Sequence, residues 1–250
     1  MDRFIHTALN SLNIVKDNAF IRSNNLANNS VPGFRADYHL KTAGTAFIDS
    51  MNTHVTRGLS IKDDSNMFDA ASGTLNETGN ALDVAIRGDG YFITDAPNGM
   101  SLSRRGDFST NTDSQLINGS SAVMLDNNLQ PITVPPYRAI DFTETGDIVI
   151  EPLNSEPGTK QIVATLGLTS PTAPLKKFPD GEIRYDDGSQ IVALQDVRVV
   201  NKYLEMSNVN LMEELVTSIE DQRIFEINLK LVKSAEEIDR GGSSLMRLPT

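Results

Sequence analysis

Apolar residues recur at steps of three and four near the start of the chain, which is the spacing of one face of an α-helix. The positions are Ile5, Leu9, Leu12, Val15, Ala19 and Leu26. Pro32 disfavours helix at the residue before it, and Gly33 permits a sharp turn. The pattern therefore predicts an N-terminal helix over residues 1–30.

The centre of the chain has a different pattern. Residues 31–80 are rich in Gly, Thr, Ser and Asn with little periodicity, which indicates an extended connector. Over residues 81–200, short apolar runs alternate with turn signals, as in an antiparallel β-domain. One hairpin is predicted where Asp83–Ile86 and Tyr91–Ile93 flank the turn sequence Arg87-Gly88-Asp89-Gly90. Other strands are expected at Ser121–Leu125, Ile148–Ile150, Gln161–Leu168, Glu182–Tyr185 and Asp196–Val200.

The segment from Asn210 to Arg240 contains no Pro or Gly and is dominated by helix formers. It predicts a C-terminal helix over residues 205–240, capped by Asn210 and ended by Gly241-Gly242, with residues 241–250 as a tail. The helix carries two apolar stripes, and such a broad apolar surface indicates several partner helices. The first stripe contains Leu211, Leu215, Phe225, Leu229 and Val232. The second starts with Met212, Val216 and Ile219, and Ile224, Ile227, Leu231, Ala235 and Ile238 continue on another face.

Pairing the two terminal helices with each other is the simplest way to bury these stripes. The predicted fold class is therefore α+β, with N- and C-terminal helices pairing as a coiled-coil-like stem and a central antiparallel β-domain. Apolar surface would remain for neighbouring subunits. The alternative is that both helices pack onto their own β-domain.

Composition narrows the function. The 250 residues carry a formal net charge of -11, which argues against binding to nucleic acid or an anionic membrane through a general positive field. The absence of Cys excludes disulfides, thiolate zinc sites and a Cys nucleophile. No run approaches the length of a transmembrane helix, and polar residues interrupt the N-terminal segment where a secretory signal would be apolar. Taken alone, this predicts a cytoplasmic protein, unless an export route ignores such signals.

No catalytic constellation is apparent. His6, His39 and His54 lack zinc spacing, and Asp63-Asp64 and Asp186-Asp187 lack the spacing of a calcium loop. No GK[ST] follows Gly88-Asp89-Gly90, and no G-x-S-x-G sequence occurs. We therefore expect no enzymatic activity, cofactor or metal.

Four motifs resemble those of the bacterial flagellar rod and hook protein family, and they occur in family order along nearly the whole chain. The N-terminal motif is Ser23-Asn24-Asn25-Leu26-Ala27-Asn28 followed by Pro32-Gly33-Phe34-Arg35. The central blocks are Gly79–Phe92 and Arg104–Phe108. The C-terminal motif is Ser207-Asn208-Val209-Asn210, then Glu213-Glu214-Leu215-Val216 and Gln222-Arg223-Ile224-Phe225-Glu226. The length and the Met1-Asp2-Arg3 opening are most similar to a proximal-rod member; a distal-rod or hook-type member is the alternative, and a secreted β-rich fibre or adhesin is a further one.

The resemblance implies a structural subunit of the hollow rod that transmits torque from motor to hook. It implies export by the flagellar type III apparatus without a cleaved signal, assembly in the periplasm, and partners among other rod subunits and surrounding ring proteins. The paired terminal helices would form the inner tube, and the β-domain would lie outside it.

The two terminal motifs are the candidate assembly sites. In the N-terminal motif these are Ser23, Asn24, Asn25, Leu26, Ala27, Asn28, Pro32, Gly33 and Phe34. In the C-terminal motif they are Asn208, Val209, Asn210, Glu213, Leu215, Gln222, Arg223, Phe225 and Glu226. Amide side chains offer donors and acceptors together, and Arg223 and Glu226 stand at i,i+3 on a helix. The alternative is that these residues have only local roles. The Ser and Asn residues would be a polar helix end, Pro32-Gly33-Phe34 a helix terminator, Asn208-Val209-Asn210 a helix cap, and Gln222, Arg223 and Glu226 a solvated polar stripe.

Overall fold

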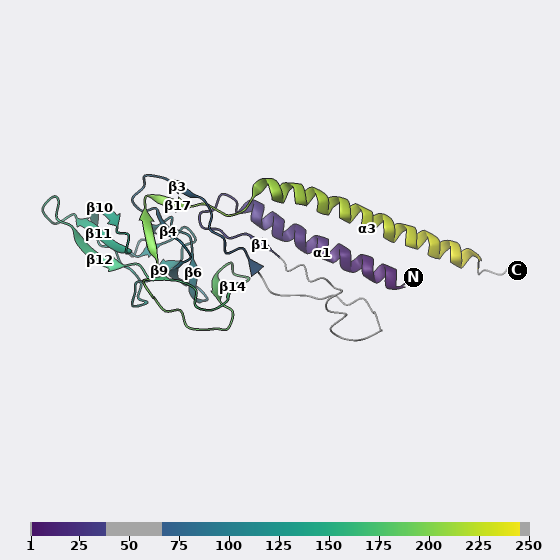
Figure 1. Cartoon of the computed structure of the whole chain (residues 1–250), viewed down its shortest axis with the longest axis horizontal. Coiled ribbons are helices and arrows are strands. Elements are labelled where there is room, and N and C mark those ends of the chain that lie inside the picture. Colours follow the sequence, from purple (N-terminus) through teal and green to yellow (C-terminus); the bar gives the residue numbers. More distant parts are fainter. Residues whose placement is uncertain (1, 39–66, 246–250) are drawn as a thin grey trace. The chain divides into compact units, whose positions relative to one another are not determined.

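The computed structural model describes residues 2–38 and 67–245, with the backbone alone for 2–10, 239 and 243–245. The chain divides into two compact units, each described here by itself. Of the described residues, the helical unit comprises 2–27, 37–38 and 210–245, and the β-rich unit comprises 28–36 and 67–209 (Figure 1). Most of the predicted connector, with His39, His54 and Asp63-Asp64, lies outside the described residues, as does the side chain of His6.

The helical unit contains α1 (Asp2–Ala27), the short strand β1 (Asp37–Tyr38) and α3 (Leu211–Leu245). The 35 residues of α3 correspond to a length of about 52 Å at 1.5 Å per residue. The helix continues through Gly241 and Gly242, where the sequence predicts its end. Glycine lowers helix propensity by only about 1 kcal/mol, without the ring clash by which proline breaks a helix.

The predicted coiled-coil-like stem is wrong. The chain has one N-terminal helix, one C-terminal helix and a large antiparallel β-rich body. A coiled coil requires apolar knobs along the contact. Among the described side chains of α1 and α3, Val15 and Ala235 are the buried apolar ones, whereas Asn25, Asp221 and Asn228 are buried polar ones. The two helices contact each other through polar groups, so the predicted apolar stripes are not buried between them.

Most strands of the β-rich unit are short and antiparallel (Figure 1). Its largest sheet has the order β14-β15-β6-β5-β9-β8-β7, with β13 also pairing with β5. A three-stranded sheet, β10-β11-β12, and the pairs β16-β4 and β17-β3 complete the described pairing within this unit. The strands are β2 (Met67–Phe68), β3 (Leu75–Glu77), β4 (Val84–Arg87), β5 (Tyr91–Ala96), β6 (Gly99–Ser103), β7 (Ser109–Thr110), β8 (Leu116–Ile117), β9 (Val123–Met124), β10 (Tyr137–Phe142), β11 (Asp147–Pro152), β12 (Gln161–Thr165), β13 (Leu168–Thr169), β14 (Leu175–Lys177), β15 (Ile183–Tyr185), β16 (Arg198–Asn201) and β17 (Tyr203–Glu205).

The hairpin predicted around Gly88-Asp89 is also wrong, because β4 pairs with β16 and β5 pairs with β6, β9 and β13. The turn instead carries the chain from one sheet to another. The guanidinium of Arg104 binds the carbonyl oxygens of Gly88 and Gly90, at 2.8 and 2.7 Å, so the turn is held by a side chain. A Cβ on Gly90 would lie 2.5 Å from Val197, which explains the absence of a side chain there.

Two apolar clusters form the core of the β-rich unit. The larger gathers residues from β4, β5, β8 to β11, β13 and β16, including the fully buried Phe92, Leu116 and Ile148. The smaller cluster contains Phe68, Tyr91, Ile93, Leu102, Leu125, Ile183, Tyr185 and Ile191. Strand β5 contributes alternate residues to the two clusters, since successive side chains of a strand point to opposite faces.

Candidate functional site

Hydrogen bonds and ion pairs connect α1 and α3. Nε of Arg22 lies 2.6 Å from Oδ2 of Asp221, and its Nη1 lies 3.2 Å from Oε2 of Glu214. Nδ2 of Asn228 donates to Oγ of Ser11 at 2.8 Å. On α3 these polar residues stand seven positions apart, at 214, 221 and 228, so they share one face of the helix.

Asn25, in the N-terminal motif, is 1% exposed and ties three segments of the helical unit together. Its amide pairs with the main chain of Asp37 in both directions, with Nδ2 donating to the carbonyl and Oδ1 accepting the N–H, each at 2.9 Å. Nδ2 also donates to Oε1 of Glu214 at 2.7 Å. A buried amide with its donors and acceptor satisfied stabilises this junction, whereas a substitution would leave main-chain groups unpaired.

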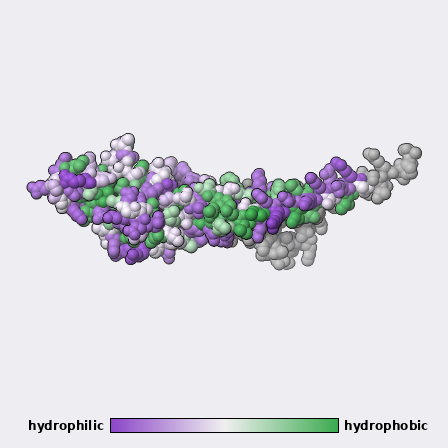
Figure 2. Space-filling view, turned by 90° about the horizontal axis from the view of Figure 1, so that it is seen from above, coloured by the Kyte–Doolittle hydropathy of each residue, from purple (hydrophilic) through white to green (hydrophobic). Residues whose placement is uncertain are grey.

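Most of the described large apolar residues of both helices are exposed, although Val15 is buried. Ile14 and Phe20 of α1 are 60% and 73% exposed. Eleven large apolar residues of α3 are also exposed: Leu211, Met212, Leu215, Val216, Ile219, Ile224, Phe225, Ile227, Leu229, Leu231 and Ile238. Figure 2 shows apolar side chains between polar ones on the surface of this part of the chain. Exposure of so many large apolar residues is typical of an interaction surface.

The other predicted residues of the helices are mostly at the surface. Ser23 is exposed and its hydroxyl donates to the carbonyl of Ala19 at 2.7 Å. Asn24, Ala27, Leu215, Gln222, Arg223, Phe225 and Glu226 are exposed, and Leu26 and Asn28 are partly buried. Arg223 and Glu226 stand at i,i+3 on α3 and form no ion pair with each other in the described part of this helix.

The predicted cap of α3 is confirmed. Oδ1 of Asn210 accepts the main-chain N–H of Glu213 at 3.4 Å, and its carbonyl accepts the N–H of Glu214 at 3.0 Å. Nδ2 of Asn210 also donates to Oε2 of Glu213 at 3.3 Å. Glu213 and Glu214 place negative charge in the first turn, where it interacts favourably with the positive end of the helix dipole.

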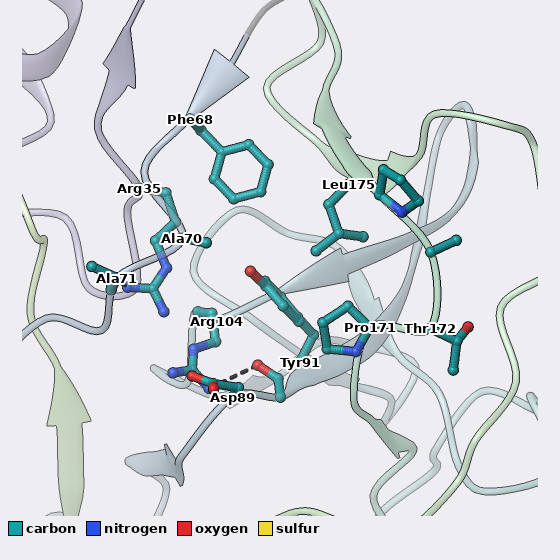
Figure 3. Close-up of a pocket in the computed structure, with 13 residues that line it drawn as sticks. Arg35, Phe68, Ala70, Ala71, Asp89, Tyr91, Arg104, Pro171, Thr172 and Leu175 are labelled. Carbon is teal, nitrogen blue, oxygen red and sulfur yellow. Dashed lines mark hydrogen bonds between the residues drawn. The ribbon is translucent and has the colours of Figure 1, made fainter.

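A pocket of about 680 Å³ opens in the β-rich unit. Its walls combine apolar groups with two arginines, Arg35 and Arg104, and with the ring of Tyr91 (Figure 3). Arg35 belongs to the segment that follows the Pro32-Gly33-Phe34 turn, so this motif reaches the pocket.

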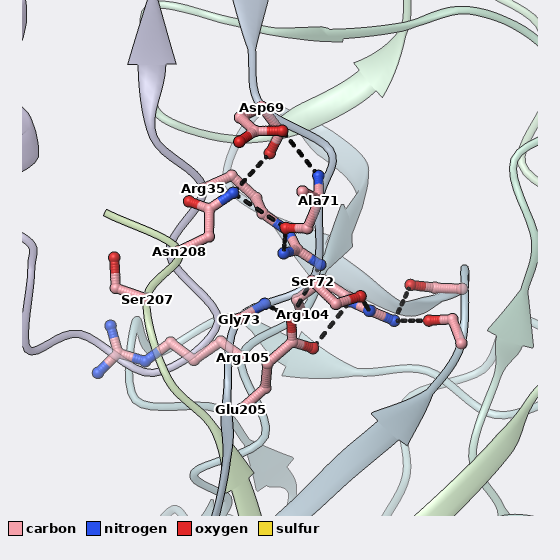
Figure 4. Close-up of polar contacts among 12 residues, drawn as sticks. Arg35, Asp69, Ala71, Ser72, Gly73, Arg104, Arg105, Glu205, Ser207 and Asn208 are labelled. Atoms are coloured by element: carbon pink, nitrogen blue, oxygen red, sulfur yellow. Dashed lines mark hydrogen bonds and ion pairs between the residues drawn. The ribbon is translucent and has the colours of Figure 1, made fainter. Parts of the chain in front are cut away.

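A buried ionic triad lies behind the pocket (Figure 4). Glu205, at the end of β17, is 2% exposed and lies between Arg35 and Arg104. Its Oε1 is 2.9 Å from Nη2 of Arg35, and its Oε2 is 3.0 Å from Nε of Arg104, although the second contact lacks the alignment of a hydrogen bond. Burial lowers the pKa of the Arg104 guanidinium, and Glu205 opposes this by stabilising the charged form.

Gly33 lies against the backbone of Arg104, where only a residue without a side chain fits. Its φ of 67° lies in the left-handed region, and a Cβ would lie 2.4 Å from the backbone of Arg104. Its N–H donates to the carbonyl of Glu205 at 2.7 Å. The ring of the next motif residue, Phe34, lies 4.1 Å from Nζ of Lys177. The preceding Pro32 is partly buried.

Asn208, in the C-terminal motif, forms hydrogen bonds to the backbone next to Arg35 (Figure 4). Its Oδ1 accepts the N–H of Ala36 at 2.7 Å, and its Nδ2 donates to the carbonyls of Asp69 and Ala71 at 3.0 and 2.9 Å. Val209 beside it is 8% exposed. The two terminal motifs therefore meet within the β-rich unit through Gly33, Phe34 and Asn208.

Sequence reasoning missed Arg22, Asp221 and Asn228 because a search for apolar periodicity passes over polar residues. The seven-residue spacing of Glu214, Asp221, Asn228 and Ala235 was the available signal. Glu205 carried no local signal, because its partners Arg35 and Arg104 are distant in sequence. Within the part of the chain that the structure describes, no helix is long and apolar enough to cross a membrane, and no cluster of three His, Cys, Asp or Glu residues could hold a metal.

Comparison with known proteins gives consistent matches. Residues 200–245 match the family described as flagellar basal body rod FlgEFG protein C-terminal. The chain is 27% identical to the flagellar basal-body rod protein FlgF of Salmonella typhimurium, over 99% of this chain and 100% of that protein. It is 27% identical to FlgF of Rhizobium meliloti over 94% of both chains. It is 34% identical to the rod protein FlgG of Agrobacterium fabrum, over 66% of this chain and 65% of that one.

Proposed function

This chain is a homologue of the flagellar basal-body rod proteins, and from that premise we propose that it is a structural subunit of the bacterial basal-body rod whose activity is assembly and not catalysis. The outward apolar surface of α1 and α3 is the observation that carries the proposal, because a rod subunit has to bury such a surface against its neighbours.

The proximal part of the rod is the proposed location. The similarity to FlgF proteins extends over nearly the whole of both chains, which supports this choice. FlgG of Agrobacterium fabrum has a higher identity over a shorter share, so a position in the distal rod is the competing assignment.

In the proposed mechanism, the subunit polymerises through its terminal helices into the hollow shaft that transmits torque and passes exported subunits. Exposed residues of α3, such as Ile227 and Phe225, would be buried against helices of adjacent subunits. The exposed polar residues Ser23, Asn24, Gln222 and Arg223 would set the geometry of those contacts. Asn25 and Asn208 would act within the subunit, because their amides bind its own main chain.

The resemblance also motivates the remaining parts of the proposal. The subunit would be exported by the flagellar type III apparatus without a cleaved signal, and it would assemble in the periplasm beside other rod subunits and the surrounding rings. Assembly would increase the order of α1 and α3, because helices without apolar packing are marginally stable. Circular dichroism and protease digestion of a dilute monomer test this last point; fully helical and protected ends would contradict it.

Truncation and point variants test the assembly role in a bacterium that carries this chain as its only copy. Removing residues 2–27 or 211–245 should abolish incorporation into purified basal bodies. Both truncations retain Glu205 and Asn208, so the β-rich unit should remain folded. The variant Ile227→Ser should reduce incorporation, whereas Ile162→Ser, at a comparably exposed apolar residue of β12, should not. Normal rods from either truncation would refute the proposal.

A further inference from the structure

The pocket of the β-rich unit has the size and lining of a binding site for a small ligand. Its volume of about 680 Å³ lies within the range of about 300–1,000 Å³ that is usual for such sites. The described lining is mainly apolar, with Phe68, Leu175, Pro171 and Pro174 among its members, and it also includes Arg35, Tyr91 and Arg104.

Tyr91 places an unpaired hydroxyl in this pocket. The residue is 3% exposed, and among the described residues its hydroxyl has no hydrogen-bond partner. Figure 3 shows the hydroxyl pointing into the space between Arg35, Phe68 and Leu175. The hydroxyl oxygen keeps accessible surface toward the open pocket, so a ligand can reach it. The hydroxyl therefore offers a donor to a group that enters the pocket.

The charges around the hydroxyl favour an anionic group. Arg35, Arg104 and Glu205 together carry an excess of one positive charge, and the guanidinium carbon of Arg104 lies 5.7 Å from the centroid of the Tyr91 ring. Burial raises the pKa of the Tyr91 hydroxyl, while Arg35 and Arg104 act to lower it more strongly than Glu205 and Asp89 raise it. Arg35 and Arg104 line the pocket, whereas Glu205 is not part of its described lining. Asp89 also lines the pocket but is exposed to solvent, which screens its charge.

We propose that this pocket binds a carboxylate carried on a small apolar group. The Tyr91 hydroxyl donates a hydrogen bond to the carboxylate, the field of Arg35 and Arg104 stabilises its charge, and Phe68, Leu175 and the prolines contact the apolar part. The inference does not depend on rod assembly. A free organic acid and an acidic side chain of a neighbouring protein share this chemistry, and the test below separates them.

The test is a titration of the purified full-length chain, followed by NMR, with benzoate and its neutral counterpart benzamide. Benzoate should bind at least about tenfold more tightly, which is close to the lower limit for one hydrogen bond to a charged group. The variant Tyr91→Phe should weaken benzoate binding by about fivefold without lowering the melting temperature, because the hydroxyl has no partner to lose. The variant Asp89→Asn should strengthen benzoate binding and leave benzamide unchanged.

The matched control is Tyr137→Phe, which removes the hydroxyl of a partly buried tyrosine of β10 that does not line the pocket, and it should change neither affinity. The capped dipeptides acetyl-Leu-Glu-amide and acetyl-Leu-Gln-amide provide the second arm. Tighter binding of the Glu peptide than of benzoate assigns the site to an acidic protein segment, and the reverse order assigns it to a free acid. Equal binding of charged and neutral probes, no binding of either acid, or an unchanged affinity in Tyr91→Phe would overturn the proposal.

Discussion

The helical unit and the β-rich unit distribute their side chains in opposite ways. In the β-rich unit, apolar residues such as Phe92, Ile93 and Ile148 have no exposed surface. In the helical unit, three of the five buried side chains that the structure describes are amides or carboxylates, and most large apolar residues are exposed. The β-rich unit therefore buries its apolar surface within one chain, whereas the helical unit leaves most of it available for other molecules.

This difference has an energetic meaning. Burial of apolar surface is the main favourable term in folding, and the β-rich unit obtains it from its own residues. Polar contacts between α1 and α3 contribute much less, since a hydrogen bond or a partly exposed ion pair adds only about 1 kcal/mol. We expect mutations of equal size to affect the stability of the two units very differently.

The largest contrast should come from two phenylalanines. Phe92→Ala should reduce the free energy of unfolding of the β-rich unit by about 3–5 kcal/mol, because it opens a cavity in the core and removes an edge-to-face contact with Phe108. Phe225→Ala, at a residue that is 40% exposed, should change monomer stability by no more than about 0.5 kcal/mol. Urea denaturation followed by circular dichroism measures both values. Similar losses in the two variants would contradict the contrast.

The buried triad allows a second test within the β-rich unit. Glu205→Gln should destabilise this unit by about 3 kcal/mol, because two buried arginines lose their shared counter-charge. Glu77→Gln is the control, at an exposed carboxylate that accepts a hydrogen bond from Tyr203, and it should cost less than about 1 kcal/mol. Thermal unfolding of the two variants gives the comparison, and equal melting temperatures would show that the triad is not coupled to stability.

Making the interhelical face apolar would sharpen the comparison further. The quadruple variant Ser11→Ala, Arg22→Leu, Asp221→Leu, Asn228→Leu should stabilise the helix pair by about 1–2 kcal/mol, since replacing both partners of a buried polar contact by apolar groups is often stabilising. The helical signal of the monomer at 222 nm should persist to higher temperature. The control variant Glu220→Leu, Glu226→Leu changes exposed residues of the same helix and should not reproduce this gain. A loss of helix in the first variant would refute the explanation.

The smallest effect concerns a carboxylate near the surface of the β-rich unit. Hydrogen bonds from Thr145 and Thr165, aided by Thr143, hold the pKa of Asp147 below its ordinary 3.8. Its contribution to stability is therefore present above pH of about 4 and is lost as the pH falls through the folded-state pKa. Asp147→Asn should cost up to about 1 kcal/mol at neutral pH. Denaturation curves near pH 2 should show almost no difference between the variant and the original chain.

Sequence patterns predicted the existence and type of both helices and the antiparallel nature of the centre, because apolar periodicity and turn residues are local signals. They failed where the outcome depends on distant partners. The turn at Gly88 has hairpin chemistry, yet Arg104 determines its conformation. Apolar stripes indicated that α3 packs against something, but polar residues at positions 214, 221 and 228 decide which face meets α1. The cap at Asn210 was predictable because both of its partners lie within four residues.

The order of side chains along α3 also fixes its axial register against α1. A shift by one heptad would move Asn228 into the place of Asp221, and Arg22 would then face an amide in place of one of its carboxylates. An apolar face of similar leucines would tolerate such a slip at little cost, whereas a polar one specifies a single alignment. Every copy of the chain would therefore present its outward apolar residues at the same height, which is the geometric requirement for a polymer with a constant repeat.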